Sequence, residues 1–407
     1  MEIRPIISTM LRNKTAPLLI AAQVALTLAI ICNALYIIRD RLSTAARPSG
    51  VDEQNVAHIR FYPHREIADL RGMQDRDIEA IRAIPGVVAA AQVNQIAMSQ
   101  SGWNTGGLTT DKDVPTDINT GYYFGQHSLV DALGLELIAG RDFLDTEIIE
   151  IDPEKDQKTP SVIILTKALA ERLFDSAEAA VGKDMYLGSG PENEPVRVVG
   201  VVRQLQNPGS PADARAENSS IVPVRWLDGY TMYAVRAEPG RLDQVMTEVE
   251  KKLLSLSSDR VLLDRRTMTE VRENRYSGEK MMAGLLIAVT AFLLLITASG
   301  IVGMASLWVN QRRKQIGVRR ALGAQKRDIL RYFLVENVLI TTGGIVAGLA
   351  LALALNNFLV TELEIPRLPV EYLAVTMVAM WVLGLLAVFG PAWRAAAVPP
   401  AIATRTA

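Results

Sequence analysis

One basic stretch of the sequence, residues 311–334, has the residue types best suited to docking a partner protein. It reads QRRKQIGVRRALGAQKRDILRYFL, with eight Lys or Arg residues against one acid, Asp328. Long uncharged segments flank it on both sides. Because short loops rich in Lys and Arg resist translocation, the stretch is predicted to lie on the cytoplasmic side of a membrane. It is either a solvated topology anchor or a docking surface for a cytoplasmic partner.

The spacing of residues within this stretch predicts a helical elbow. Ile316 and Arg319 fit a helix that ends at Gly323, because glycine adopts the left-handed cap conformation without a steric penalty. A second helix is predicted to begin near Gln325 and to continue into the next apolar segment. We therefore expect two helical arms at the membrane surface.

Motifs for bond-making or bond-breaking chemistry do not occur in the sequence. The nearest Gly-Lys pair, Gly182–Lys183, is followed by Asp184, so there is no GxxxxGK[ST] phosphate loop. Nucleophile elbows, zinc-binding helices and dinucleotide glycine loops do not occur either. The three His residues lack metal-ligand spacing. We expect no catalytic residue, metal or cofactor in this chain.

Composition points to a mixed membrane protein. The chain has 407 residues, of which 49% are hydrophobic and 21% charged, too apolar for an ordinary soluble protein and too charged for a pure membrane bundle. A formal net charge of -1 argues against nucleic-acid binding. The single Cys32 excludes an intrachain disulfide, so an external domain must be held together by its own core.

Four apolar runs are predicted to be transmembrane helices, at residues 18–38, 281–310, 335–360 and 372–393. The first is long enough to cross a hydrocarbon core of ~30 Å. We expect no ionisable side chain within the spans, which disfavours an ion-coupled carrier. Gln23 and Asn33 are assigned to hydrogen bonds between helices, and Gly344 and Gly348 offer a close helix contact of the GxxxG kind.

The predicted fold is a membrane protein of four transmembrane α-helices, one before and three after a large α+β domain outside the cytoplasm. That domain, with a stalk, occupies residues 39–280, and its strand–helix–strand pattern suggests small sandwiches. The remaining predicted segments are a cytoplasmic interfacial segment at 1–17, the elbow at 311–334, an external loop at 361–371 and a cytoplasmic tail at 394–407.

Capping signals predict where helices of the external domain begin. Asp75 is expected to cap a helix that stops at Pro85, and Thr267 to form a capping box with Glu270. No proline follows Thr267 until well beyond Val309, so one helix could leave the domain as a stalk and cross the membrane. A bend at Ser277–Gly278, two residues that could break the helix, is the alternative.

The order of one span, a large domain and three spans resembles the permease portion of the MacB/FtsX family of ABC transporters. The segment 315–324, QIGVRRALGA, followed by Arg327-Asp-Ile-Leu, is similar to the family's elbow. The external block resembles the family's periplasmic core domain in five short motifs, Ile81–Val87, Gly140–Phe143, Leu169–Phe174, Val181–Lys183 and Val198–Val202.

This resemblance implies a permease subunit without an ATPase domain, so that ATP is bound by a partner chain. In the family the elbow is the coupling helix engaged by the ATPase dimer, and Gln315 stands where Glu is common. The residues implied to make that contact are Gly317, Arg319, Arg320, Ala321, Leu322, Gly323, Ala324, Asp328 and Ile329.

The resemblance also implies partners and a location. The partners are an ABC ATPase subunit, a second copy or paralogue of the permease, and, as a further candidate, a periplasmic membrane-fusion adaptor. The location is the bacterial inner membrane, with both termini in the cytoplasm. The expected function is ATP-driven export or extraction of a substrate, with a signalling or scaffold module for a cell-envelope partner and a lipoprotein-releasing permease as alternatives.

Overall fold

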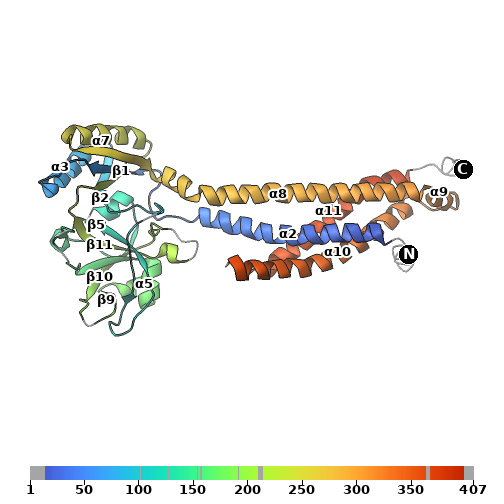
Figure 1. Cartoon of the computed structure of the whole chain (residues 1–407), viewed down its shortest axis with the longest axis horizontal. Helices are drawn as coiled ribbons and strands as arrows, with labels where there is room; N and C mark the ends of the chain where they lie inside the picture. Colours follow the sequence, from blue (N-terminus) through green and yellow to red (C-terminus); the bar gives the residue numbers. More distant parts are fainter. Residues whose placement is uncertain are drawn as a thin grey trace. The chain divides into compact units, whose positions relative to one another are not determined.

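The computed structural model describes residues 14–397 apart from 101, 127, 154, 156–157, 191, 210–213 and 364–366 (Figure 1). Most of the predicted interfacial segment and of the predicted cytoplasmic tail therefore lies outside the described residues, apart from residues 14–17 and 394–397. The chain forms two compact units. We call residues 46–277 the α/β domain, and the described residues before and after them the helical unit.

Four helices are long and apolar enough to cross a membrane, namely α2 (Thr15–Ala45), α8 (Met268–Gln311), α10 (Lys326–Leu363) and α11 (Val370–Ala396). A short helix, α9 (Arg313–Ala321), joins α8 to α10. One span precedes the α/β domain and three follow it. The predicted fold class is therefore confirmed.

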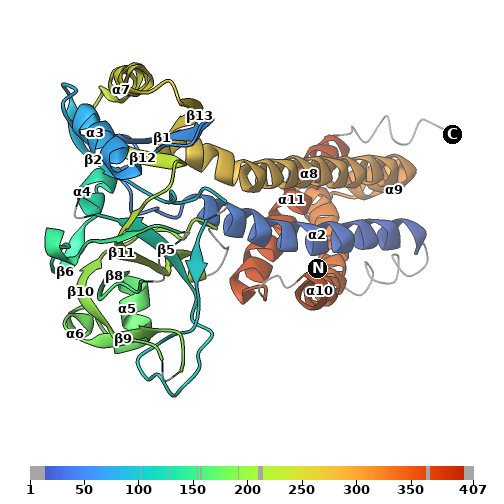
Figure 2. The same cartoon turned by 60° about the vertical axis from the view of Figure 1, so that its left-hand side comes forward.

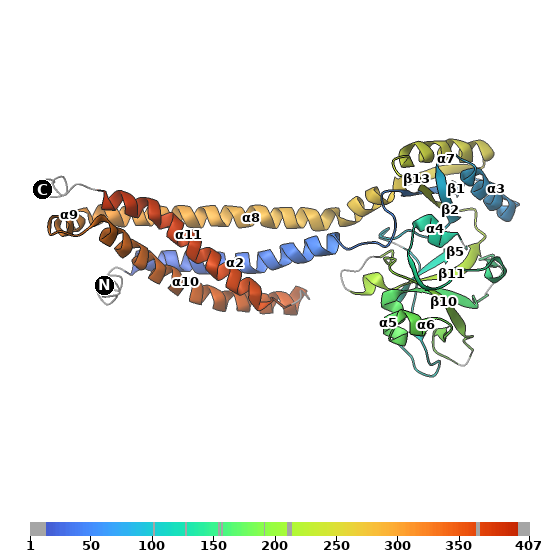
Figure 3. The same cartoon turned by 180° about the vertical axis from the view of Figure 1, so that it is seen from behind.

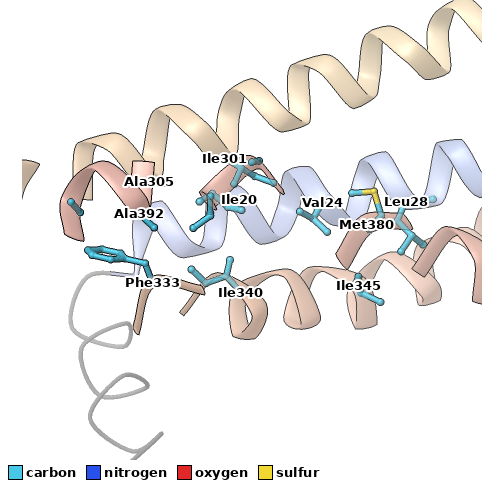
Figure 4. Close-up of a cluster of buried hydrophobic side chains, with 14 of the residues drawn as sticks. Ile20, Val24, Leu28, Ile301, Ala305, Phe333, Ile340, Ile345, Met380 and Ala392 are labelled. Atoms are coloured by element: carbon cyan, nitrogen blue, oxygen red, sulfur yellow. The ribbon is translucent and has the colours of Figure 1, made fainter. Parts of the chain in front are cut away.

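The core of the helical unit forms where α2 packs against the other three spans (Figure 4). Its buried side chains include Ile20, Val24, Leu28, Ile301, Ile340, Ile345 and Met380. Hydrogen bonds between helices add to this packing. Gln23 donates to the Ile296 carbonyl at 3.1 Å and Asn33 to the Ala352 carbonyl at 3.2 Å, which confirms the role predicted for these two side chains.

Two glycines let α10 approach α2 closely. A Cβ atom on Gly344 would lie 2.7 Å from the carbonyl oxygen of Ala21, and one on Gly348 would lie 2.9 Å from that of Ala25. Both separations are too short for a real side chain. The two residues singled out for helix packing thus lie in a contact within the chain, between α2 and α10.

A four-stranded antiparallel sheet forms one part of the α/β domain, with the strand order β13-β1-β12-β2. Its strands are β1 (Val56–Pro63), β2 (Val87–Gln92), β12 (Thr231–Ala237) and β13 (Arg260–Thr267). Helices α3 (Leu70–Arg82) and α7 (Leu242–Leu256) cover one face (Figure 2). Beneath them the Asp77 carboxylate is buried, pairs with Arg260 and accepts a 2.7 Å hydrogen bond from Tyr233.

A mixed sheet of nine strands forms the other part, ordered β3-β5-β11-β8-β10-β9-β4, with β6 on β10 and β7 on β11. Strands β8 and β10 are parallel, and the helices α5 (Lys167–Phe174) and α6 (Ala177–Ala180) lie between them in sequence. The strands are β3 (Asn104–Thr105), β4 (Leu108–Thr109), β5 (Thr120–Gly125), β6 (Leu137–Gly140), β7 (Ile149–Ile151), β8 (Val162–Thr166), β9 (Asp184–Leu187), β10 (Val196–Val202) and β11 (Ser219–Trp226).

The predicted start of α3 was wrong. The helix begins at Leu70, and Asp69 is its N-cap, with its carboxylate accepting a hydrogen bond from the Gly72 amide at 2.8 Å. Asp75 lies inside the helix instead, and its carboxylate is 2.8 Å from the guanidinium of Arg225. A long-range ion pair therefore uses the side chain that the local pattern had assigned to a cap.

Candidate coupling site

Two places bear on coupling, the start of α8 within the α/β domain and the elbow within the helical unit, and each is described by itself. The start of α8 has the predicted capping box. The Thr267 amide donates to the Glu270 carboxylate at 2.8 Å, and the Glu270 amide donates to the Thr267 hydroxyl at 3.2 Å. Two amides that lack helical partners are thereby satisfied, which fixes where α8 starts.

Arg272, one turn further, fastens α8 to the loop before β1. Its guanidinium forms two hydrogen bonds to the Glu53 carboxylate and donates to the Arg47 carbonyl at 2.8 Å. Burial alone would raise the pKa of Glu53, but hydrogen bonds from Arg272 and Ser49 outweigh it and lower that pKa below its ordinary value. The carboxylate is therefore held in its charged form, which is the form that binds Arg272.

Tyr276 extends this attachment by another turn. Its ring is buried, its hydroxyl lies 3.1 Å from Oε1 of Gln206, and the Arg272 guanidinium packs over the ring at 5.5 Å. Ser277 remains inside α8, where its hydroxyl donates to the Asn274 carbonyl at 3.0 Å. α8 continues as one helix to Gln311, so Ser277 and Gly278 do not end it.

The elbow has the two arms that the sequence predicted. α9 ends at Ala321, and Gly323 follows with a left-handed φ of 99°, its amide donating to the Arg320 carbonyl at 3.2 Å. α10 begins at Lys326. At this start the Asp328 carboxylate accepts a 2.9 Å hydrogen bond from the Gln325 amide. Local capping thus defines both sides of the bend.

The residues predicted to contact an ATPase do not share one environment. Arg319, Ala321, Leu322, Gly323 and Asp328 are exposed, and the Leu322 side chain is 83% exposed. Arg320 and Ala324 are half-buried. Gly317 and Ile329 are buried, and Ile329 belongs to a core with Ile316, Phe333 and Ala392. Part of the predicted set therefore forms an outer surface, and part attaches that surface to the helical unit.

An ion pair that the sequence analysis missed ties the elbow to α10. The Arg312 guanidinium lies 3.0 and 2.9 Å from the two carboxylate oxygens of Glu336, whose side chain is only 2% exposed. Glu336 falls inside the predicted third span, so the expectation that the spans contain no ionisable side chain was wrong. Glu336 is the first acid after Asp328 and lies in an apolar helix. An isolated acid in such a helix could have been recognised in the sequence as one that needs a partner.

Figure 3 shows α9 at the same end of the helical unit as the start of α2 and the end of α11. The Arg319 guanidinium packs over the Tyr332 ring at 5.2 Å at this end, and Arg312 also reaches the Tyr332 hydroxyl at 3.4 Å. Among the residues that are described, no cluster of His, Cys, Asp or Glu could hold a metal ion. The arrangement suits binding and transmission of movement.

Comparison with known proteins gives two family matches. Residues 24–252 match the model of the MacB-like periplasmic core domain, which covers more than half of the chain. Residues 287–400 match the C-terminal domain of FtsX-like permeases. The second match includes α9 and the start of α10, and the first ends before α8 begins.

Three curated relatives are ATP-binding/permease proteins. The macrolide export protein MacB of Bradyrhizobium diazoefficiens is 29% identical over 56% of this chain and 35% of its own length. The MacB protein of Agrobacterium fabrum is 25% identical over 82% of this chain and 51% of its own. The pyoverdine export protein PvdT of Pseudomonas fluorescens is 25% identical over 61% and 38%. The chain spans between about a third and a half of the length of these relatives.

Proposed function

The chain belongs to the family with the MacB-like periplasmic core domain, and on that premise we propose that it works as a permease driven by an ATPase on another chain. The relatives are named ATP-binding/permease proteins, and this similarity supports coupling of the permease to ATP hydrolysis. The four apolar helices and the family place the protein in a bacterial inner membrane. We infer that the elbow and both termini face the cytoplasm, since the elbow is strongly basic.

One observation carries this proposal: the elbow has an exposed outer surface and an inner side that packs against the helical unit. Leu322 and Gly323 stand outside, where a partner could press on them, while Ile316, Ile329 and the Arg312–Glu336 pair attach the same elbow to α8, α10 and α11. A displacement of the outer surface would therefore move the end of α8. Closely packed interiors transmit such displacements because they have few voids.

The other end of α8 supports the second half of the proposal. Arg272 and Tyr276 hold the first turns of α8 within the α/β domain, and we infer that a shift or rotation of α8 acts on this domain. ATP-driven movement of that domain would then export or extract a substrate.

A second permease copy is the proposed partner within the membrane. In the most apolar window of α8 only 17% of residues are buried, against 56% for α2, and Phe292 and Leu295 are exposed. Cross-linking through Phe292→Cys, in a Cys32→Ala background, is expected to give dimers. Val375→Cys on α11 is the control, and equal cross-linking from both positions would place the contact elsewhere.

Co-purification with an ATPase subunit tests the coupling proposal. Leu322→Glu is expected to abolish complex formation and stimulated ATP turnover, because it puts a charge on the outer surface of the elbow without disturbing the core. Leu256→Glu, an equally drastic change at a 43% exposed position of α7, is the matched control and should have no effect. The proposal is wrong if Leu322→Glu binds and stimulates the ATPase like the unmodified protein.

A further inference from the structure

The α/β domain contains a cavity of about 370 Å³ on the face of the four-stranded sheet opposite to α3 and α7. This volume is within the range of small-molecule sites, which is roughly 300–1,000 Å³. A second cavity, of about 110 Å³, shares three of its lining residues, Asn94, Trp103 and Tyr230. The two cavities together have a polar part and an aromatic part.

Charged side chains from β1 and β13 line the larger cavity. Arg60 forms two hydrogen bonds to the Asp264 carboxylate and donates to the Tyr230 hydroxyl at 3.2 Å. Arg266 makes a single contact, its Nε atom lying 3.4 Å from the same carboxylate. His58 Nε2 lies 3.6 Å from Asp264 as well. Two guanidinium groups thus share one carboxylate, which leaves an excess positive charge in this cavity.

Arg266 has N–H donors that could bind a ligand. A guanidinium has five N–H donors in a planar fork that matches the oxygens of an organic acid. Its side chain is 46% exposed, so a ligand could reach it from solvent. The other acid nearby, Asp228, lines only the smaller cavity, and its carboxylate already accepts a 3.1 Å hydrogen bond from the Tyr230 amide.

An aromatic cluster lines the other part. The Trp103 ring meets the rings of Phe124 and Trp226 edge-on, with centroid distances of 5.2 and 4.9 Å, while the latter two stack at 5.2 Å. Trp103 lies in a loop and is 48% exposed. An exposed indole beside a cavity offers a flat surface on which a planar ring can pack.

Two amide side chains, Gln95 and the half-buried Asn94, hold these walls in place. Gln95 is buried, donates to the Trp103 carbonyl at 3.2 Å and accepts from the Trp103 amide. Asn94 accepts from the Phe124 amide at 2.8 Å and donates to the Tyr122 carbonyl at 3.0 Å. A site whose walls are fixed before binding loses less conformational entropy when a ligand arrives.

The backbone of the same loop is strained. Met98 and Gln100 have φ values of 65° and 69°, and both residues line the larger cavity. In the part of the chain that is described, Asp175 is the only other non-glycine residue with positive φ. Bulky residues rarely adopt this conformation, and such strain concentrates at binding sites. Val271 and Asn274, from the first turns of α8, complete the lining.

We propose that the two cavities bind a small planar organic anion, an aromatic or heteroaromatic acid, whose ring packs on Trp103 and whose acid group pairs with Arg266. The bound molecule would also contact the start of α8, through Val271 and Asn274. The site is formed within the α/β domain alone, so it binds whether or not the elbow meets an ATPase.

Binding of three matched probes to the full chain in lipid nanodiscs tests this site. The probes are 2-naphthoate, its neutral amide and the cationic 2-naphthylmethylamine. Their binding is measured by saturation-transfer NMR and by quenching of tryptophan fluorescence. We expect saturable binding of naphthoate, binding of the amide weaker by about tenfold, since one charge-assisted contact is lost, and no saturable binding of the amine. Empty nanodiscs correct for partitioning into lipid.

Two variants assign the roles. Arg266→Gln should reduce the affinity for naphthoate to that for the amide, whereas Arg265→Gln should leave it unchanged, because Arg265 pairs with Glu250 at 3.0 Å and does not line the cavity. Trp103→Leu should weaken the binding of naphthoate and of its amide. The unfolding temperature of this variant is measured to show that it still folds. Equal binding of the three probes, equal affinities of the two Arg variants, or the absence of saturable naphthoate binding would each overturn the proposal.

Discussion

The half-buried Arg312 and the buried Glu336 form an ion pair that joins the end of α8 to α10, with nitrogen–oxygen distances of 3.0 and 2.9 Å. Removing one partner leaves the other charge without compensation in a poorly hydrated place. The pair therefore makes α8, α9 and α10 behave as one body at this end of the helical unit.

We expect Glu336→Ala to lower the free energy of unfolding by about 3–5 kcal/mol, the usual cost of breaking a buried pair. Thermal unfolding in detergent measures this loss. Arg313→Ala, a change at an exposed neighbouring residue, is the control and should be nearly silent. A double-mutant cycle with Arg312→Ala should give a coupling energy of about 0.5–3 kcal/mol, and strict additivity would show that the two charges act independently.

Glu53→Gln should loosen the start of α8, because it removes the charge that binds Arg272 in two hydrogen bonds. Hydrogen bonds to charged groups are worth about 1.5–3 kcal/mol, so amide hydrogen exchange in the first three turns of α8 should accelerate by roughly tenfold or more. Glu273→Gln, at the exposed position beside Arg272, is the matched control. Unchanged exchange in Glu53→Gln would mean that Tyr276 and the apolar contacts suffice.

Gly344→Ala should destabilise the helical unit, whereas Gly343→Ala should not. A Cβ at Gly344 meets the Ala21 carbonyl and the Val24 side chain, while a Cβ at Gly343 meets nothing within 4 Å. Overpacking costs about 1–3 kcal/mol, and the change at the open position should be neutral or slightly stabilising because alanine favours the helix. Unfolding temperatures of the two variants decide, and equal values would contradict the close approach of α10 to α2.

Asp264 should give the α/β domain an acid-dependent stability. Burial alone would raise the pKa of Asp264, but hydrogen bonds from His58 and Arg60 outweigh it and hold that pKa well below its ordinary value. The folded form thus binds the proton less tightly than the unfolded form. The stabilisation is fully present above about pH 4, the ordinary pKa of Asp, and is lost progressively as the pH falls from there through the lower pKa of the folded form.

Hydrogen exchange of β1 and β13 in the full chain, followed from neutral pH to about pH 3, measures this dependence. After correction for the intrinsic pH dependence of exchange, Asp264→Asn should be less protected than the unmodified protein at neutral pH. The difference should shrink in acid, because below about pH 4 the unfolded form of the unmodified protein takes up a proton that the folded form does not bind. A difference that stays constant with pH would mean that the charge of Asp264 is not what stabilises the strands.

Features that depend on neighbours in sequence were predictable. The Thr267–Glu270 capping box, the left-handed Gly323 and the four apolar runs are encoded within a few residues, and the structure contains each of them. The Glu53–Arg272 and Arg312–Glu336 pairs join different elements, and no local periodicity identifies such partners. Asp69 and Asp75 illustrate the difficulty, because both can cap a helix and only the fold assigns one of them to Arg225.

The coupling role of residues 317–329 stays a prediction, although the structure sharpens it. From the sequence alone, Leu322 and Ile329 are equivalent apolar positions of the elbow. Packing separates them, since Leu322 is exposed and Ile329 is buried against the core of the helical unit. Leu322 can therefore be substituted without disturbing the fold, whereas Ile329 cannot. The spacing of the two residues in the sequence does not distinguish them.

The unbroken course of α8 has a consequence for its length. Each residue of an α-helix advances by about 1.5 Å and turns by about 100°. One residue inserted after Gly278 would thus swing Arg312 a quarter-turn and more around the axis relative to Arg272, and the azimuth of every side chain beyond the insertion would change with it. Seven inserted residues would nearly restore the angle while lengthening α8 by about 10 Å. Comparing the two insertions separates the effect of rotation about the helix axis from the effect of helix length.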